Sequence, residues 1–196
     1  MESTKGVLGM KNSGNIDQLL ADSFKELAQA IPIEKITIKQ ITDKAGVIRP
    51  TFYNHFQDKY ELLEWILRTE VIDPIRPLLR HHYLDEAMEM MFTNLYNNKA
   101  FYEHAIKLEG QNSFDSIVNA CMYELVSDYI AQSSIKASTK YKWLTRERIA
   151  KYYSRSLCMF LLEWIKTGMD TVSPKELAEI YHVLISSTMT DIQDVL

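Results

Sequence analysis

Basic side chains gather in one short stretch of this chain. Residues 35–59 contain two acids, Asp43 and Asp58, and a larger number of bases. The five bases are Lys35, Lys39, Lys44, Arg49 and Lys59. Lysine and arginine donate hydrogen bonds to phosphate, and a local excess of positive charge attracts a polyanion. This stretch can therefore bind a nucleic-acid backbone, and DNA is the first partner to consider.

The rest of the chain is acidic. The 196 residues carry a formal net charge of −4, and residues 63–196 contain fourteen lysines and arginines against eighteen aspartates and glutamates. This balance excludes a generally basic coat, so any contact with DNA has to be local. Because 46% of the residues are hydrophobic, the chain has ample material for a core and is not expected to be disordered.

The basic stretch lies within residues 36–62, whose end signals predict a helix-turn-helix. Thr37 and Gln40 have the spacing of a capping box, which begins a helix. Gly46 ends this helix, because the sharp turn between two crossing helices needs a positive φ. Pro50 suits the first turn of the second helix. The apolar anchors of that helix, at helical spacing, are Phe52, Tyr53 and Phe56.

Helical periodicity continues on both sides of this segment. Residues 16–31 form an amphipathic pattern that predicts a first helix. Asp58 begins a third helix that we expect to run to about Glu70, before Pro74 and Pro77 bend the chain. No segment alternates as a strand would. The sequence therefore predicts an all-α fold with a three-helix head followed by a helical domain.

Two helices near the carboxy terminus have the clearest boundaries. Thr145 begins one that ends near Gly168, and residues 173–176 combine an N-cap, a first-turn proline and a capping glutamate for the next. Wide apolar stripes cover both helices, at about 146–168 and 174–192. Such stripes can pack inside one subunit or form a four-helix seam with a second copy. The stripes alone leave both arrangements open.

Other kinds of chemistry find little support in the sequence. It has no GxxxxGK, GxGxxG, HExxH or GxSxG motif, so we expect no enzyme and no cofactor. Cys121 and Cys158 lie far apart in apolar helical patterns and are predicted to be buried thiols. No segment approaches about eighteen successive apolar residues, and the start lacks a signal-peptide run. We therefore expect a cytoplasmic protein with no membrane contact.

This order of features resembles the tetracycline-repressor (TetR) family of one-component transcription regulators. The resemblance covers about residues 16–67 and is carried by the segments TIKQITDKAGV, RPTFYNHF and DKYELL after the amphipathic first helix. It implies a homodimer that binds a double-stranded DNA operator, with the last two helices forming the dimer. Repression is the expected direction of control. The effector, whether small molecule or protein, is not identified by the resemblance.

The carboxy-terminal half is similar to regulators of the dihydroxyacetone-kinase type from Gram-positive bacteria. The matching segments are Phe101-Tyr102, Gly110-Gln111-Asn112-Ser113-Phe114, Tyr152-Tyr153 and Glu163-Trp164-Ile165-Lys166-Thr167-Gly168-Met169. Members of this branch control different genes, so the similarity does not name an operon.

The resemblance also implies a division of the chain into four parts. These are a flexible N-terminal arm at 1–14, a helix-turn-helix DNA-binding domain at 15–57, a connecting helix at 58–72, and an effector-binding and dimerisation domain at 73–196.

By the same resemblance, particular side chains contact DNA. Those in the recognition helix, facing the major groove, are Arg49, Pro50, Thr51 and Tyr53. The side chains expected to contact phosphate are those of Thr37, Tyr53, His55 and Lys59. Arg49 can offer two donors to a guanine edge, and Lys39 matches a contact to base or phosphate. Asn54 replaces the aromatic residue common at its position, so its role stays open. Ile48 either touches a thymine methyl or packs.

Three alternatives stay open. The chain could be an autonomous enzyme, or a protein-interaction module or co-regulator that uses the helix-turn-helix as a scaffold. It could also be a metal-responsive member of the family. His81 and His82 are adjacent and point about 100° apart on a helix, so a metal site would need His104 or another ligand from elsewhere.

An effector pocket is expected where the helices after the prolines converge. The candidates are Tyr83, Met88, Phe92, Tyr96, Phe101, Tyr102, Met122, Tyr123, Tyr152 and Trp164. Methionines and aromatic residues at helical spacing fill a core more often than they line a pocket. We therefore assign no single residue to ligand binding.

Overall fold

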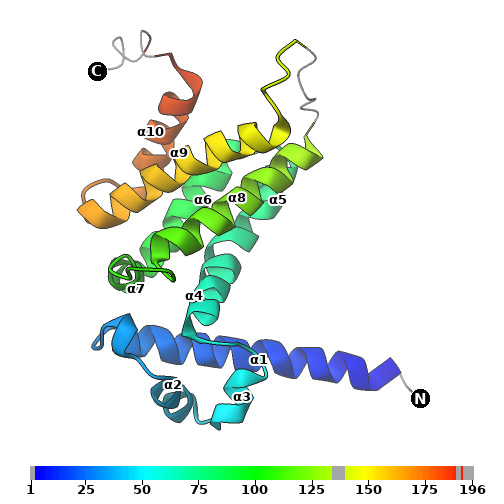
Figure 1. Ribbon diagram of the computed structural model, residues 1–196, viewed down its shortest axis with the longest axis vertical. Coiled ribbons are helices and arrows are strands. Elements are labelled where there is room, and N and C mark those ends of the chain that lie inside the picture. The colour runs from blue at the N-terminus through cyan, green and yellow to red at the C-terminus, as the bar shows by residue number, and fades with distance from the viewer. Residues whose placement is uncertain (1–2, 134–139, 189–190, 192–196) are drawn as a thin grey trace. The chain divides into compact units, whose positions relative to one another are not determined.

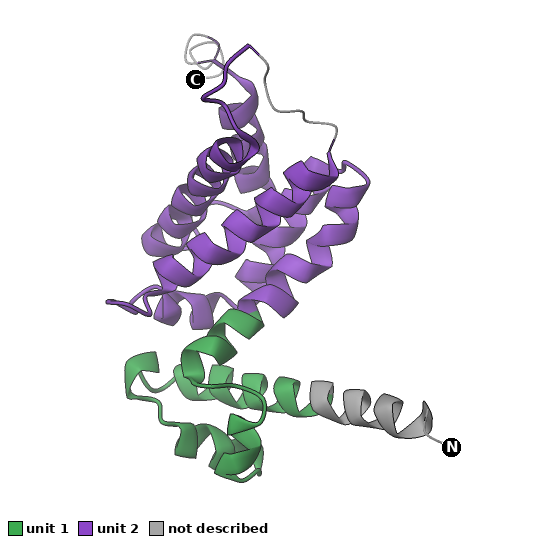
Figure 2. Ribbon diagram, turned by 45° about the vertical axis from the view of Figure 1, so that its right-hand side comes forward, with its two compact units in different colours: residues 1–66 green, residues 67–196 purple. Residues whose placement is uncertain are grey.

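All regular secondary structure in the described part of the chain is helical. The computed structural model describes the backbone of residues 3–133, 140–188 and 191, and within these ranges the side chains from residue 15 onwards. No strand occurs among these residues, which confirms the all-α prediction. The chain divides into two compact units, Met1–Ile66 and Leu67–Leu196 (Figure 2). Within the described residues, no helix combines the length and apolar character needed to cross a membrane.

Unit 1 contains the predicted helix-turn-helix. Its elements are α1 (Ser3–Ala28), the 3₁₀ turn η1 (Ile33–Lys35), α2 (Ile38–Ala45), α3 (Arg49–Tyr53) and most of α4 (Lys59–Leu67) (Figure 1). Helix α2 packs against both α1 and α3. Side chains from each helix form one core, in which Phe24, Ile41, Phe52 and Leu63 are fully buried. Burial of this apolar surface is what holds such short helices in place.

The ends of the helices in unit 1 follow from their sequence. The Thr37 hydroxyl accepts a hydrogen bond from the Gln40 amide at 3.2 Å, and the Gln40 side chain accepts one from the Thr37 amide at 2.8 Å. This reciprocal pair confirms the predicted capping box. Gly46 has a φ of 68°, as the turn requires. The Asp58 carboxylate accepts hydrogen bonds from the Tyr60 and Glu61 amides and so caps α4.

The predicted N-terminal arm overlaps a helix. Helix α1 already begins at Ser3, so the backbone of residues 3–14 is assigned to α1 and not to a separate segment. Residues 1–2 lie outside the described residues. The functional division of the chain into arm, head, connecting helix and effector domain stays a prediction.

Unit 2 is a bundle of helices. Its elements are the π-helical turn η2 (Arg68–Ile72), the 3₁₀ turn η3 (Asp73–Ile75), α5 (Arg76–Arg80), α6 (Leu84–Asn97), α7 (Lys99–Ala105), α8 (Phe114–Gln132), α9 (Arg146–Thr167) and α10 (Pro174–Ser186). Helices α8 and α9 run side by side, and α10 packs against α6 (Figure 1). Phe92, Leu161 and Trp164 are among the buried residues of this core.

Helix α10 is shorter than predicted. The apolar stripe suggested a helix to about residue 192, whereas α10 ends at Ser186. Ser187 is extended, and the amide and hydroxyl of Thr188 both donate to the Asp191 carboxylate, at 2.9 and 2.7 Å. Short polar side chains that bond the nearby backbone compete with helix formation. Residues 189–190 and 192 lie outside the described residues.

Both cysteines are buried, as predicted. Cys121 and Cys158 are free thiols inside unit 2, and neither is more than 2% exposed. Burial raises the pKa of the Cys158 thiol to about 12. A thiol with such a pKa has almost no nucleophilic thiolate at neutral pH, so Cys158 is a packing residue.

Candidate nucleic-acid interface

Helix α3 is held from one side by aromatic packing. Phe52 is fully buried, and its ring lies 5.9 Å from that of Phe56, which in turn lies 5.9 Å from that of Trp65. Aromatic pairs at such distances stabilise a core beyond their buried area. These contacts fix the rotation of α3 about its own axis, and so decide which of its side chains face solvent.

The outer face of α3 carries the residues predicted to read bases. Arg49 and Tyr53 lie one helical turn apart and are both exposed, Tyr53 by 51%. The Arg49 guanidinium is 3.4 Å from the Tyr53 hydroxyl, within hydrogen-bonding distance. Arg49 makes no ion pair with any residue that the structure describes, so most of its donors are available to a ligand. Pro50 and Asn54 are also exposed, and Thr51 is half-buried.

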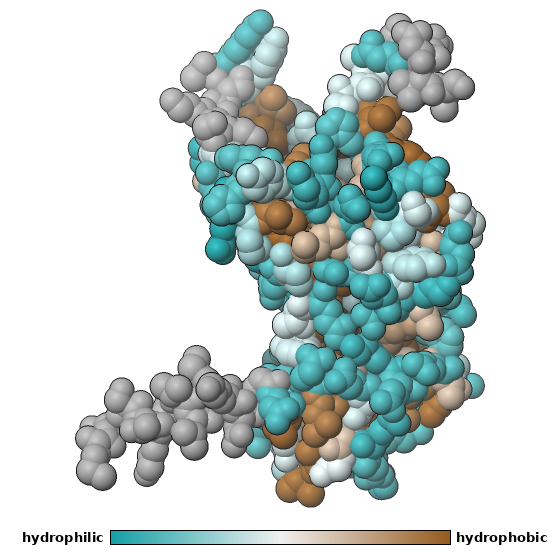
Figure 3. Space-filling model, turned by 180° about the vertical axis from the view of Figure 1, so that it is seen from behind, coloured by the Kyte–Doolittle hydropathy of each residue, from teal (hydrophilic) through white to brown (hydrophobic). Residues whose placement is uncertain are grey.

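Ile48 does not pack inside unit 1. Its side chain is 69% exposed at the N-cap of α3, and apolar surface is visible over the α2–α3 turn at the lower end of the view in Figure 3. Ile48 therefore does not pack against the described residues of the head, and this one of its two predicted roles is wrong. Contact with a thymine methyl stays a prediction.

Lys59 holds unit 1 together by a contact that the sequence did not reveal. Its ammonium donates hydrogen bonds to the carbonyl oxygens of Ile33, Glu34 and Ile36, at 2.8, 2.7 and 2.9 Å. Burial lowers the pKa of Lys59, and Glu34 and Asp58 oppose that shift. All three ammonium protons are engaged in these bonds, so the predicted phosphate contact would require Lys59 to exchange some of them.

We expect Lys59→Met to destabilise unit 1. The substitution keeps much of the aliphatic stem but leaves three carbonyls without their charged donor, which costs about 1–3 kcal/mol in the free energy of unfolding. Urea unfolding followed by circular dichroism measures this change. Lys44→Met is the matched control, because Lys44 makes only an exposed ion pair with Glu26. Equal stability of the two variants would show that the hydrogen bonds of Lys59 do not stabilise unit 1.

Other predicted phosphate contacts also have partners within unit 1. His55 Nδ1 lies 2.6 Å from a carboxylate oxygen of Asp17, and both side chains are mostly buried. The Lys39 ammonium lies 2.5 Å from Asp43 on the solvent-facing side of α2. The Thr37 hydroxyl belongs to the capping box described above. The contacts of Thr37 and His55 help to position the backbone of the head, whereas the exposed Lys39–Asp43 pair lies within one helix. Contact of these residues with phosphate stays a prediction.

Sequence reasoning missed Asp17 and the structural role of Lys59. Asp17 lies 38 residues before His55, and the carbonyls bound by Lys59 lie 23 to 26 residues before it. Local patterns report partners within about four residues on a helix, so neither contact has a signal in one dimension.

A separate cavity of about 380 Å³ lies inside unit 2. It is bounded by α6, α8, α9 and α10, with Leu79 of α5. Of the ten residues predicted as pocket candidates, only Met88 lines it. Phe92, Phe101, Tyr102, Met122 and Trp164 are buried core residues, whereas Tyr83 and Tyr152 are exposed. Aliphatic side chains form most of the cavity wall, and their pattern resembles that of any core.

The adjacent histidines point to different neighbours. The ring of His81 lies 6.4 Å from that of Tyr83, and the ring of His82 lies 6.3 Å from that of Tyr129. Over the described ranges, no group of three or more His, Cys, Asp or Glu side chains has the arrangement of a metal site.

Comparison with known families gives two matches along the chain. Residues 23–66 match "Bacterial regulatory proteins, tetR family", and residues 83–187 match the family TetR_C_8, described as "Transcriptional regulator C-terminal region". The first match covers the helix-turn-helix and the second covers most of unit 2. Both confirm the resemblance inferred from the order of caps, turn and anchors.

Two similar proteins bear on the branch of the family. The HTH-type dhaKLM operon transcriptional activator DhaS of Lactococcus lactis subsp. lactis (strain IL1403) is 23% identical over 186 residues, which is 95% of each chain. A solved structure named dihydroxyacetone kinase operon activator DhaS has a TM-score of 0.61 and 22% identity, covering 91% of this chain and 96% of its own. The structural likeness shows the fold. Together with the family matches, these relatives confirm the similarity to the dihydroxyacetone-kinase branch.

Proposed function

We propose that this chain, which belongs to the TetR family of bacterial regulatory proteins, binds a DNA operator as a homodimer and is switched by an effector in unit 2. The observation that carries the proposal is the outer face of α3. There Arg49 and Tyr53 are exposed side by side on a helix whose other face is anchored by Phe52. A DNA-bound regulator of this kind would act in the cytoplasm, where bacterial DNA lies.

Arg49 is the residue proposed to read sequence. A guanidinium can donate two parallel hydrogen bonds to the edge of guanine in the major groove. Tyr53, one turn further along, would contact the neighbouring phosphate and orient Arg49 through the Arg49–Tyr53 contact. Pro50, Thr51 and Asn54 complete the proposed interface on α3. Lys39, at the start of α2, would add a charged contact at the edge.

Dimerisation is proposed to use α9 and α10. Five large apolar side chains are exposed on these helices: Tyr152, Tyr153, Met159, Ile180 and Leu184. Tyr152 and Met159 are seven residues apart and share one face of α9, while Ile180 and Leu184 are four apart on α10. Figure 3 shows apolar surface along the α10 end of unit 2. A second copy that covers this surface would remove it from water and form a four-helix seam.

The names of the two relatives bear on the direction of control. The sequence favoured repression, whereas both relatives described above are named activators. Because of these names, we propose activation, and not repression, as the direction of control. A promoter–reporter assay decides between them, since deletion of the gene lowers expression from the target promoter in one case and raises it in the other.

A protein-interaction module built on a helix-turn-helix scaffold is the competing function. It would leave the exposed Arg49 and Tyr53 without a role in DNA binding. The family and the curated relative are both described as transcription regulators, so we propose no enzymatic activity.

Footprinting on the DNA upstream of the gene tests the proposal. We expect a protected near-palindrome with half-sites about one helical turn apart. Arg49→Ala should weaken binding to it by about 10- to 100-fold, equivalent to 1–3 kcal/mol, and relax specificity at one base pair of each half-site. Lys44→Ala removes the same charge from the same unit, and it should change binding little because the Lys44 ammonium is paired with Glu26. Lack of specific protection, or equal effects of both substitutions, would contradict the proposed role of α3.

A further inference from the structure

We infer that the effector of unit 2 is amphipathic, with an apolar body in the 380 Å³ cavity and one anionic head group bound at Arg80. A medium-chain carboxylate represents this class. The inference rests on the proposed function only in calling the ligand an effector, because the binding site itself is defined by unit 2 alone.

The cavity favours an apolar body. Its aliphatic walls include Leu84, Met88, Val126, Ile149, Leu157 and Ile185. No lysine, arginine, aspartate or glutamate lines it. Tyr181, on the same wall, has a pKa raised to about 12 by burial, so its side chain is uncharged at neutral pH. A volume of 380 Å³ lies at the lower end of the range for small-molecule sites, about 300–1,000 Å³.

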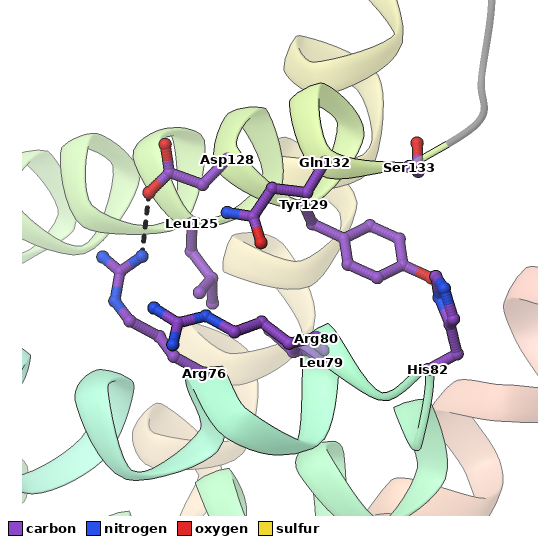
Figure 4. Close-up of a pocket in the computed structure, with 9 residues that line it drawn as sticks. All are labelled: Arg76, Leu79, Arg80, His82, Leu125, Asp128, Tyr129, Gln132 and Ser133. Carbon is purple, nitrogen blue, oxygen red and sulfur yellow. Dashed lines mark hydrogen bonds and ion pairs between the residues drawn. The ribbon is translucent and has the colours of Figure 1, made fainter.

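A small polar pocket adjoins this cavity. It has a volume of about 60 Å³ and shares three wall residues with the cavity: Leu79, Leu125 and Tyr129. Figure 4 shows the guanidinium groups of Arg76 and Arg80 on one side of the pocket, with Asp128 and Gln132 opposite them on α8. The shared walls place a charged site directly beside the apolar one.

The charges around the polar pocket leave Arg80 free to bind an anion. Arg76 donates to Asp128 at 2.8 Å and to Asp73 at 3.0 Å, and lies 3.5 Å from Glu124, which also pairs with Arg68. Each of these three acids therefore already has an arginine partner in Arg76 or Arg68. Arg80 pairs with no acid among the described residues. Figure 4 shows its guanidinium near the side-chain amide of Gln132, which offers a second donor.

The pocket is large enough for a head group and too small for a whole ligand. A volume of about 60 Å³ is far below the roughly 300–1,000 Å³ of sites that hold a whole small molecule. A carboxylate fits this space, and a guanidinium binds a carboxylate through two parallel hydrogen bonds. The remainder of the ligand would then extend past Tyr129 into the cavity.

The loop between α5 and α6 contacts Tyr129, one of the residues shared by the polar pocket and the cavity. His82 has a φ of 62°, in the left-handed region that residues other than glycine rarely adopt. This conformation sets the His82 ring edge-on to Tyr129, with 6.3 Å between the ring centroids. Backbone conformations of this kind cost free energy and concentrate at ligand sites. Tyr129, supported in this way, is the side chain that a ligand occupying both sites would pass.

Isothermal titration calorimetry on the full chain tests the inference with three probes. Decanoate has an apolar chain and an anionic head, decanol has the same chain without the charge, and dihydroxyacetone has neither. Leu157→Trp fills the cavity, and Ile149→Phe narrows it from a second position on α9. Arg80→Gln removes the charged head-group donor, and Lys107→Gln removes an exposed charge that lines neither site. Circular dichroism checks the fold of each variant.

We expect saturable binding of decanoate below its micellar concentration and no binding of dihydroxyacetone. Arg80→Gln should weaken decanoate about tenfold or more, from the loss of a charge-assisted pair, and leave decanol unchanged. Lys107→Gln should have no effect, and at least one folded cavity variant should abolish binding of both probes. Absence of decanoate binding, insensitivity to the cavity variants, or equal effects of Arg80→Gln on decanoate and decanol would overturn the inference. Operator protection by the same protein shows separately whether the proposed regulatory function stands.

Discussion

The double variant Met159→Lys, Leu184→Lys is expected to be a monomer and to bind its operator roughly a hundredfold or more weakly than the wild type. Met159 is 70% exposed on α9 and Leu184 is 47% exposed on α10. In a symmetric dimer each introduced charge appears twice, so the seam loses apolar burial and gains like charges that must be desolvated. A monomer binds one half-site only and loses the high effective concentration that a linked second head provides.

Analytical ultracentrifugation and operator titration measure the two effects together. Met90→Lys is the matched control, because Met90 is an exposed methionine on α6, outside the proposed seam. It should leave both the sedimentation coefficient and the operator affinity unchanged. A double variant that still sediments as a dimer would show that α9 and α10 do not form the interface.

Phe52→Ala is expected to unfold the DNA-binding head. Phe52 is fully buried between its neighbours, with its ring 5.7 Å from that of Tyr53 and 5.9 Å from that of Phe56. Removing a buried phenylalanine side chain costs about 3–5 kcal/mol, which is comparable to the whole stability of many small domains. The variant should lose operator binding because α3 no longer has a fixed orientation.

Thermal unfolding monitored by circular dichroism should show part of the helical signal lost at a lower temperature. Tyr83→Ala is the control, since Tyr83 is an exposed aromatic residue in unit 2 and its removal creates no cavity. If Phe52→Ala unfolds at the wild-type temperature, aromatic packing does not hold α3 in place.

The sequence predicted the head well because its signals are local. A capping box needs residues three apart, a turn needs one glycine, and a recognition helix needs anchors one turn apart. Thr37, Gly46 and Phe52 each satisfy such a rule, and the structure places all three as expected. The helix boundaries around Thr145 and Ser173 were predictable for the same reason.

Contacts between distant segments could not be predicted in this way. Periodicity does not specify how helices pack. Three features depend on that packing: the hydrogen bonds of Lys59, the His55–Asp17 pair and the wall of the cavity. Aromatic residues such as Phe92 and Trp164 were candidates for a pocket, but they fill the core while aliphatic residues surround the space. Neither class of side chain indicates on which side of a helix a void is left.

Fluorescence anisotropy with a labelled duplex from the upstream region tests most directly whether α3 reads an operator. The wild type, Arg49→Ala and Lys44→Ala are titrated against the operator and a scrambled duplex at several salt concentrations. We expect the wild type to bind the operator at least about a thousandfold more tightly than the scrambled duplex. Arg49→Ala should lose much of that preference while retaining weak, salt-dependent binding. Equal wild-type affinity for both duplexes, or an Arg49→Ala variant that discriminates as well as the wild type, would contradict operator reading by α3.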